Sequence, residues 1–155
     1  MNGTIVSDSA SPIIELGALQ IWVHGYQFPE ATDAWDGNWL RVTARCSVPG
    51  ATVEVTGAIL DTVSFQRFQG ELARVYQTLD GVATLESHEP NLTVVVQAHR
   101  STGHLEARVD ITPDHMYQEH SFLIGADQTH LPAVMRGCAE VLRQYPIRDP
   151  AARGA

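Results

Sequence analysis

Hydrophobic and polar residues alternate along most of this chain, which is the pattern of strands with one buried and one exposed face. The clearest case is residues 104–111, where every second residue is apolar and the others are polar or charged. Turn-forming sequences separate the alternating segments, and Pro49-Gly50 and residues 100–103 each predict a hairpin. The predicted strands cover residues 19–24, 40–48, 53–59, 82–87, 92–99, 104–111 and 119–126.

Two other segments repeat their apolar residues at steps of three and four, as amphipathic helices do. The first follows Asp61-Thr62, either of which can cap a helix, and Gly81 stands where a glycine commonly ends one. Thr129 is the predicted cap of the second helix, and Tyr145-Pro146 ends it. The apolar stripes consist of Phe65, Phe68, Leu72, Val75 and Leu79 in the first helix, and of Leu131, Val134, Cys138, Val141 and Leu142 in the second.

The order strands, helix, strands, helix predicts an α+β fold. We expect an antiparallel sheet of about six or seven strands with the two helices packed on one face. The chain has 155 residues, enough for one hydrophobic core. We therefore expect a single domain over residues 1–155, with an ordered core at about 13–148 and mobile tails at 1–12 and 149–155.

Charge narrows the possible partners. The formal net charge is −8, with 18 acidic residues against ten basic ones, all of them arginine. A surface that is negative on average repels the phosphate backbone, so we expect no nucleic-acid partner. A basic protein is the natural complement of such a surface, because opposite potentials steer encounter. The alternative is that the acidity only keeps the protein soluble.

The compartment follows from what the sequence lacks. No N-terminal stretch joins basic residues to an apolar run, and no apolar stretch is long enough for a membrane span. The two cysteines, Cys46 and Cys138, fall at apolar positions of their elements, which favours reduced thiols in the core. We expect a cytoplasmic protein with no membrane partner.

Motifs for catalysis, phosphate binding or zinc binding are not found in the sequence. The tightest histidine cluster is His115 and His120 with Asp114 and Glu119, and its alternative interpretation is a polar loop. His99 and His104 flank a hairpin turn, but two ligands do not complete a metal site. We predict no catalytic residue, cofactor or metal, and a hydrolase that uses histidines near 99–120 remains the third hypothesis.

Residues 25–42, GYQFPEATDAWDGNWLRV, are the most distinctive stretch. If the helices cover one face of the sheet, Trp22 and Trp39 lie on the other face. An open sheet face with tryptophan, arginine and acids has the composition of an interaction hot spot. The predicted partner-binding residues are Trp22, Glu30, Asp33, Trp35, Asp36, Trp39 and Arg41.

A structural interpretation of the same stretch stays open. The loop can fold back over the open face and bury Tyr26, Phe28 and Trp35 against the two other tryptophans. Asp33 or Asp36 would then make turn hydrogen bonds. The loop is in either case a partner surface or a structural plug, and we do not expect a catalytic loop.

Several short motifs give the chain a resemblance to a known family. In chain order they are GYQFPE, DAWDGNWLRV, GELARVYQTL, HEPNL and QYPIR. They are similar to those of WapI-type bacterial immunity proteins, over about residues 13–148. The positions that match the family's motif are Gly25, Tyr26, Phe28, Pro29, Asn38, Trp39, Leu40, Glu89 and Pro90.

The resemblance implies a non-enzymatic, cytoplasmic antitoxin that binds a toxin domain and blocks it. It brings no catalytic residues with it. Because nuclease domains are commonly basic, an acidic inhibitor could occupy their nucleic-acid face. The alternative function is a small-molecule or accessory binding protein of a bacterial operon, with the open sheet face as its pocket.

Overall fold

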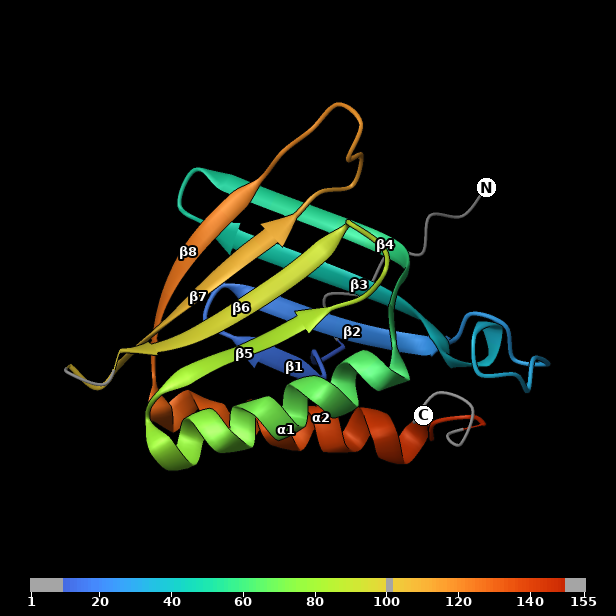
Figure 1. The fold of residues 1–155 in the computed structure, drawn as a ribbon. Helices are drawn as coiled ribbons and strands as arrows, with labels where there is room; N and C mark the ends of the chain where they lie inside the picture. Colours follow the sequence, from blue (N-terminus) through green and yellow to red (C-terminus); the bar gives the residue numbers. More distant parts are fainter. Residues whose placement is uncertain (1–9, 100–101, 150–155) are drawn as a thin grey trace.

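The computed structural model describes residues 10–99 and 102–149 as eight strands, two α-helices and two short 3-10 helices (Figure 1). What was predicted for residues 1–9, 100–101 and 150–155 lies outside the described residues. The strands are β1 (Ile14–Leu16), β2 (Leu19–Tyr26), β3 (Trp39–Val48), β4 (Ala51–Asp61), β5 (Gly81–Glu86), β6 (Leu92–His99), β7 (His104–Ile111) and β8 (Ser121–Asp127). The helices are η1 (Asp36–Asn38), α1 (Thr62–Thr78), η2 (Gln128–His130) and α2 (Leu131–Gln144).

The α+β class, the antiparallel pairing and the two helices are confirmed, but the single sheet is wrong. The strands form two four-stranded antiparallel sheets, β1-β2-β3-β4 and β5-β6-β7-β8, here called sheet A and sheet B. Helix α1 stands between the two sheets in the chain, since it follows β4 directly and precedes β5. The alternation of apolar residues shows which face of a strand is buried, and it is the same whether that face meets helices or another sheet. The extra strand, β1, has three residues and is too short to leave a clear period.

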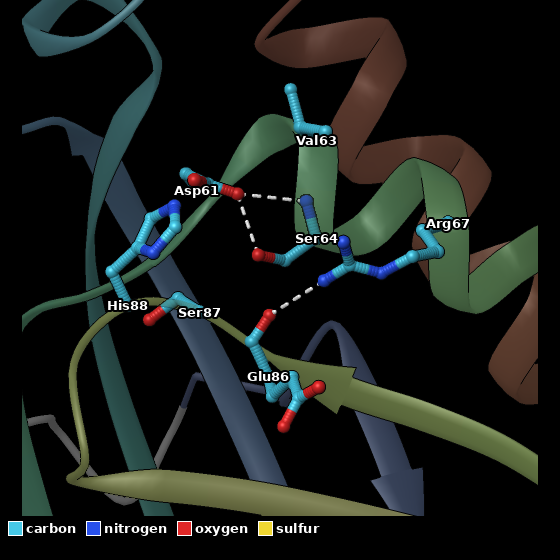
Figure 2. A pocket seen from close by; sticks show the side chains of 7 residues that line it. All are labelled: Asp61, Val63, Ser64, Arg67, Glu86, Ser87 and His88. Carbon is cyan, nitrogen blue, oxygen red and sulfur yellow. Dashed lines mark hydrogen bonds between the residues drawn. The ribbon is translucent and has the colours of Figure 1, made fainter.

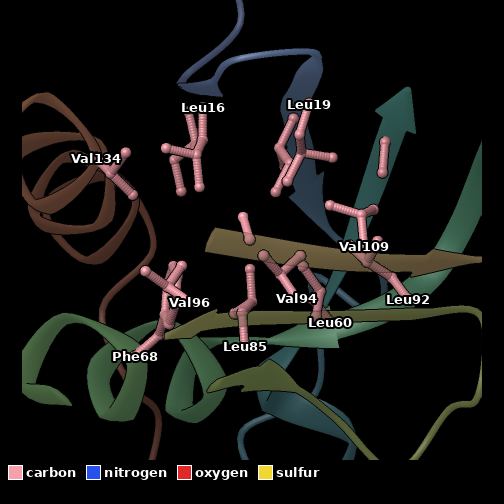
Figure 3. Close-up of a cluster of buried hydrophobic side chains, with 14 of the residues drawn as sticks. Leu16, Leu19, Leu60, Phe68, Leu85, Leu92, Val94, Val96, Val109 and Val134 are labelled. Carbon is pink, nitrogen blue, oxygen red and sulfur yellow. The ribbon is translucent and has the colours of Figure 1, made fainter. Parts of the chain in front are cut away.

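The apolar faces of the two sheets and of both helices share one core (Figure 3). Helix α1 lies along β5 and α2, and α2 also contacts β1, so the helix pair closes one side of the space between the sheets (Figure 1). Phe65 and Phe68 of α1 are fully buried there. Burial of each such side chain contributes about 1.5–3 kcal/mol relative to exposure. The outward faces of both sheets carry the polar residues of the alternation.

The ends of the helices confirm one prediction and correct two. Asp61 caps α1, because its carboxylate accepts a hydrogen bond from the backbone N–H of Ser64 at 2.7 Å. At the other end α1 stops at Thr78 with Leu79 as its C-cap at φ of 52°, and Gly81, at φ of 90°, is already the first residue of β5. Asp127, not Thr129, is the N-cap of η2, which leads directly into α2: its carboxylate accepts a hydrogen bond from the Thr129 N–H at 2.8 Å.

Candidate functional site

Loop 27–38 joins β2 to β3 at the end of the molecule where α1 begins and α2 ends (Figure 1). The pairing of β2 with β3 shifts between Val23 and Gly25, which is a β-bulge. Gly25 has φ of 150°, a value that favours glycine. The bulge bends β2 just before the chain leaves the sheet, and it therefore sets the direction of the loop.

Asp33 stabilises a turn within the loop. Its carboxylate accepts hydrogen bonds from the backbone N–H groups of Trp35 at 3.2 Å and Asp36 at 3.0 Å. The Gly37 N–H also donates to the Asp33 carbonyl at 3.1 Å. This is the turn hydrogen bonding expected of a short acidic side chain, so Asp33 shapes the loop.

The segment after α2 braces the loop. The Arg148 guanidinium donates to the carbonyl oxygens of Phe28 and Ala31 and lies over the Tyr26 ring, 3.6 Å from its centroid. Tyr26 also meets Tyr145 edge to face, with ring centroids 5.4 Å apart. The segment Tyr145–Arg148, here called the strap, thus holds a loop more than 100 positions earlier in the chain. Sequence analysis missed this role, since no local pattern marks a long-range contact.

Asn38 joins the loop, the strap and α1. Its amide nitrogen donates to the carbonyls of Ala34 and Arg148, each at 2.8 Å. Its amide oxygen accepts from the Thr62 hydroxyl and the Arg148 N–H, each at 2.8 Å. The side chain is fully buried, and these four hydrogen bonds use both of its N–H donors and both lone pairs of its amide oxygen. Asn38 is therefore a structural centre of this end of the molecule.

The braced loop presents aromatic surface outward. Trp35 is 63% exposed and Phe28 is 45% exposed, so the expected plug over the sheet is wrong for these two residues. Tyr26 is half-buried, but against the strap and not against the tryptophans. The Trp35 ring lies 6.0 Å from the ring of His88, in the loop between β5 and β6. Glu30 and Asp36 of the same loop are exposed.

The other predicted residues lie on the outward face of sheet A. Trp22 is only 7% exposed: its indole N–H donates to the Ala10 carbonyl at 2.9 Å, and the Arg45 guanidinium lies 5.1 Å from its ring centroid. Burial of this indole favours a structural role for Trp22. Trp39 is half-buried, and Arg41 is exposed on the same face.

A pocket of about 210 Å³ is lined on one side by His88, the residue whose ring meets Trp35. Figure 2 shows the start of α1 on one side of it and the end of β5 on the other. The Asp61 carboxylate accepts from Ser64 on its rim, and Arg67 donates to the backbone carbonyl of Glu86 at 3.1 Å. The volume is below the range of about 300–1,000 Å³ usual for small-molecule sites, so it fits a single side chain better than a ligand.

A second hollow, of about 330 Å³, lies on the outward face of sheet B between Arg108 and Leu123. Its volume falls at the lower limit of small-molecule sites. Glu106, which also lines it, is the one carboxylate among its lining residues. Its other lining residues are Val95 and Gln97, and Arg108 pairs with Asp110, so the hollow offers few polar groups to a ligand.

The remaining titratable groups bear on the hypotheses of metal and thiol chemistry. Within residues 10–99 and 102–149, no group of three or more His, Cys, Asp or Glu side chains is arranged to hold a metal ion. His99 and His104 face each other across β6 and β7, and His115 and His120 lie in the loop between β7 and β8. Both cysteines are free and buried, and burial raises the pKa of the Cys138 thiol to about 12. Such a thiol is a poor nucleophile at neutral pH.

No helix in the described part of the chain is long and apolar enough to cross a membrane. Comparison with curated proteins gives no match. The model of the immunity protein WapI-like family matches residues 13–146, which include both sheets, both helices and loop 27–38. Two of the positions that match the family's motif, Tyr26 and Asn38, contact the strap. The chain belongs to the immunity protein WapI-like family.

Proposed function

We propose that this protein neutralises a toxin domain in the cytoplasm by stoichiometric binding, and that loop 27–38 forms part of its contact surface. Membership of an immunity protein family implies a toxin-neutralising role and a toxin as the partner. The mode of binding, the residues and the chemistry of the toxin are our proposals.

The observation that supports this surface is an exposed tryptophan on a braced loop. Trp35 is 63% exposed, yet its backbone is fixed by Asp33 and the loop is fixed by Arg148. A loop held in place before binding loses little conformational entropy on association. Tryptophan is also among the residue types enriched at binding hot spots. We assign Trp35 as the main anchor.

The charges of the loop favour a basic partner. Loop 27–38 contains Glu30, Asp33 and Asp36 and no basic residue. Because Asp33 is committed to the turn, Glu30 and Asp36 are the carboxylates that would steer the partner, and the half-buried Trp39 and the exposed Arg41 would lie at the margin. A toxin that acts on nucleic acid carries a basic substrate-binding face, which an acidic protein can occupy in place of phosphates. We therefore propose a basic nuclease domain as the toxin.

The test uses as partner a basic nuclease toxin domain from the host of this chain. Its affinity is measured by calorimetry for the wild-type protein, for Trp35→Ala, and for Glu30→Gln combined with Asp36→Asn. Loss of a central aromatic anchor costs about 2 kcal/mol or more, which corresponds to about 30-fold weaker binding. The charge variant should associate more slowly at low salt, and this difference should shrink at high salt.

Matched variants control for general surface effects. Tyr76→Ala removes an exposed aromatic ring from α1, and Glu15→Gln with Glu106→Gln removes two exposed carboxylates from the sheets. These proteins should bind like the wild type. Unchanged affinity of the Trp35 and charge variants would reject the proposed surface, and failure of the wild-type protein to bind or inhibit the toxin domain would reject the function itself.

A further inference from the structure

The loop between β7 and β8, residues 112–120, exposes two large apolar side chains. Met116 is 71% exposed and Tyr117 is 88% exposed. They are held in a defined turn, because the N–H groups of Tyr117 and Gln118 donate to the Asp114 carbonyl at 3.2 and 2.9 Å, and the Met116 N–H donates to the Asp114 carboxylate at 3.1 Å. The two side chains are thus displayed on an ordered turn.

This loop is fastened to the loop between β5 and β6, residues 87–91. The Asn91 amide donates to the carbonyls of Thr112 and Pro113 at 2.9 and 3.3 Å, and the Thr112 N–H donates to the Asn91 carbonyl at 3.0 Å. Loop 87–91 in turn meets loop 27–38 through the rings of His88 and Trp35. These contacts link the three loops in a row, which runs from the blue loop at the right of Figure 1 to the orange loop at the top.

The row concentrates the charge of the protein. Loops 27–38, 87–91 and 112–120 contain six acidic residues and no arginine or lysine, so 26 residues carry −6 of the formal net charge of −8. The acidic residues are Glu30, Asp33, Asp36, Glu89, Asp114 and Glu119. A negative potential of this kind at one end orients a basic partner toward that end before contact.

Exposed apolar side chains are concentrated in the same row. Seven large hydrophobic residues are exposed in the described part of the chain, and four of them lie in these loops: Phe28, Trp35, Met116 and Tyr117. Single exposed hydrophobic residues are ordinary, but their gathering beside acids at one end matches the aromatic and methionine enrichment of protein interfaces.

We infer that loop 112–120 is a second partner-binding segment, and that the contact surface spans all three loops, with Trp35 at one end and Met116 and Tyr117 at the other. The partner that fits it is a basic protein with an apolar spot opposite each end. This inference rests on the proposed function and adds to it the extent of the surface and a second anchor.

The test uses the same toxin domain. Met116→Ser combined with Tyr117→Ala should weaken binding at least tenfold, mainly by faster dissociation. Glu119→Gln should slow association at low salt. Leu123→Ala and Glu106→Gln are the matched controls, because Leu123 is 67% exposed on the outward face of sheet B and Glu106 is an exposed acid on that face. Both controls should bind within twofold of the wild type.

The outcomes separate the two levels of the proposal. If Trp35→Ala weakens binding while the Met116 and Tyr117 variant binds like the wild type, loop 112–120 lies outside the interface and this inference is wrong, although the proposed function stands. If the wild-type protein does not bind the toxin domain, both fail. Protection of amide hydrogens in loop 112–120 on complex formation, with unchanged exchange near Leu123, would support the inference by an independent readout.

Discussion

Asn38 offers the sharpest test of how this end of the molecule is held together. Replacing it with alanine removes four hydrogen bonds of 2.8 Å at once. The partners left behind belong to three separate segments: Ala34 in the loop, Thr62 at the start of α1, and Arg148 in the strap. No other side chain named at the site joins these three segments, so the change should affect their mutual attachment more than the core.

The expected loss of stability depends on how deeply each hydrogen bond of Asn38 is buried. Two of the bonds, to the Ala34 carbonyl and from the Thr62 hydroxyl, are buried, and each group left without a partner costs about 1–3 kcal/mol. The two bonds with Arg148 are partly buried, so water can replace them at lower cost. We expect Asn38→Ala to lower the free energy of unfolding by about 3 kcal/mol, or the Tm by about 6–12 °C for a chain of this size.

Chemical and thermal denaturation measure this directly, with two graded controls. Thr62→Val removes a single partner of Asn38 and should cost about 1 kcal/mol. Asn91→Ala removes a half-buried amide that donates to two carbonyls and should cost less than about 1 kcal/mol. If Asn38→Ala destabilises no more than Asn91→Ala does, the four bonds are not a structural centre and our account of the loop is wrong.

Three further predictions concern other parts of the fold. Gly137→Ala should lower the free energy of unfolding by about 1–3 kcal/mol, because a Cβ at this position would clash with the backbone carbonyl oxygen of Ile13, next to β1. Gly70→Ala is the control: a Cβ there meets open space, so the change should stabilise α1 by up to about 1 kcal/mol. Equal effects of the two changes in denaturant titrations would contradict this prediction. The Cys138 thiol, with its pKa raised to about 12, should resist a thiol reagent at pH 8 until the protein unfolds, so rapid labelling of native protein would contradict its burial. The hydrogen bond from Arg143 lowers the pKa of Glu140 from 4.5 to about 2, so its contribution to stability is present above about pH 4.5 and is lost as the pH falls toward 2; Glu140→Gln should flatten the pH dependence in that window, and a carboxyl NMR titration checks the pKa.

The sequence predicted a structural feature correctly where the residues that cause it are neighbours along the chain. Asp61 caps α1 because a side chain and an N–H three positions later need no other part of the fold to meet. The error at Gly81 is of a different kind. Gly81 does have a positive φ, of 90°, but the helix ends two residues before it, with Leu79 as the cap at φ of 52°, a conformation in which glycine is the usual residue.

In the candidate site, too, the features with a local cause were predictable and those that depend on distant contacts were not. That loop 27–38 is acidic and aromatic was evident from composition, and the turn made by Asp33 is a local property of its short carboxylate. The alternation of apolar and polar residues does not predict that Trp35 is exposed while Trp22 is buried. It places Trp22 correctly on the outward face of its strand, but it gives no information on what covers that face.

The sequence by itself determined the element types, the antiparallel hairpins, the buried faces and the acidic loop, because each depends on residues that are neighbours along the chain. Only the tertiary structure decided that the strands divide into two sheets and that the strap braces loop 27–38. Tertiary contacts also decided that three loops align at one end. Arg148 and Asn38 are 110 positions apart, and their contact leaves no periodic pattern in the sequence. Such contacts are fixed by how whole elements pack, since the same apolar face can be buried by a sheet or by a helix.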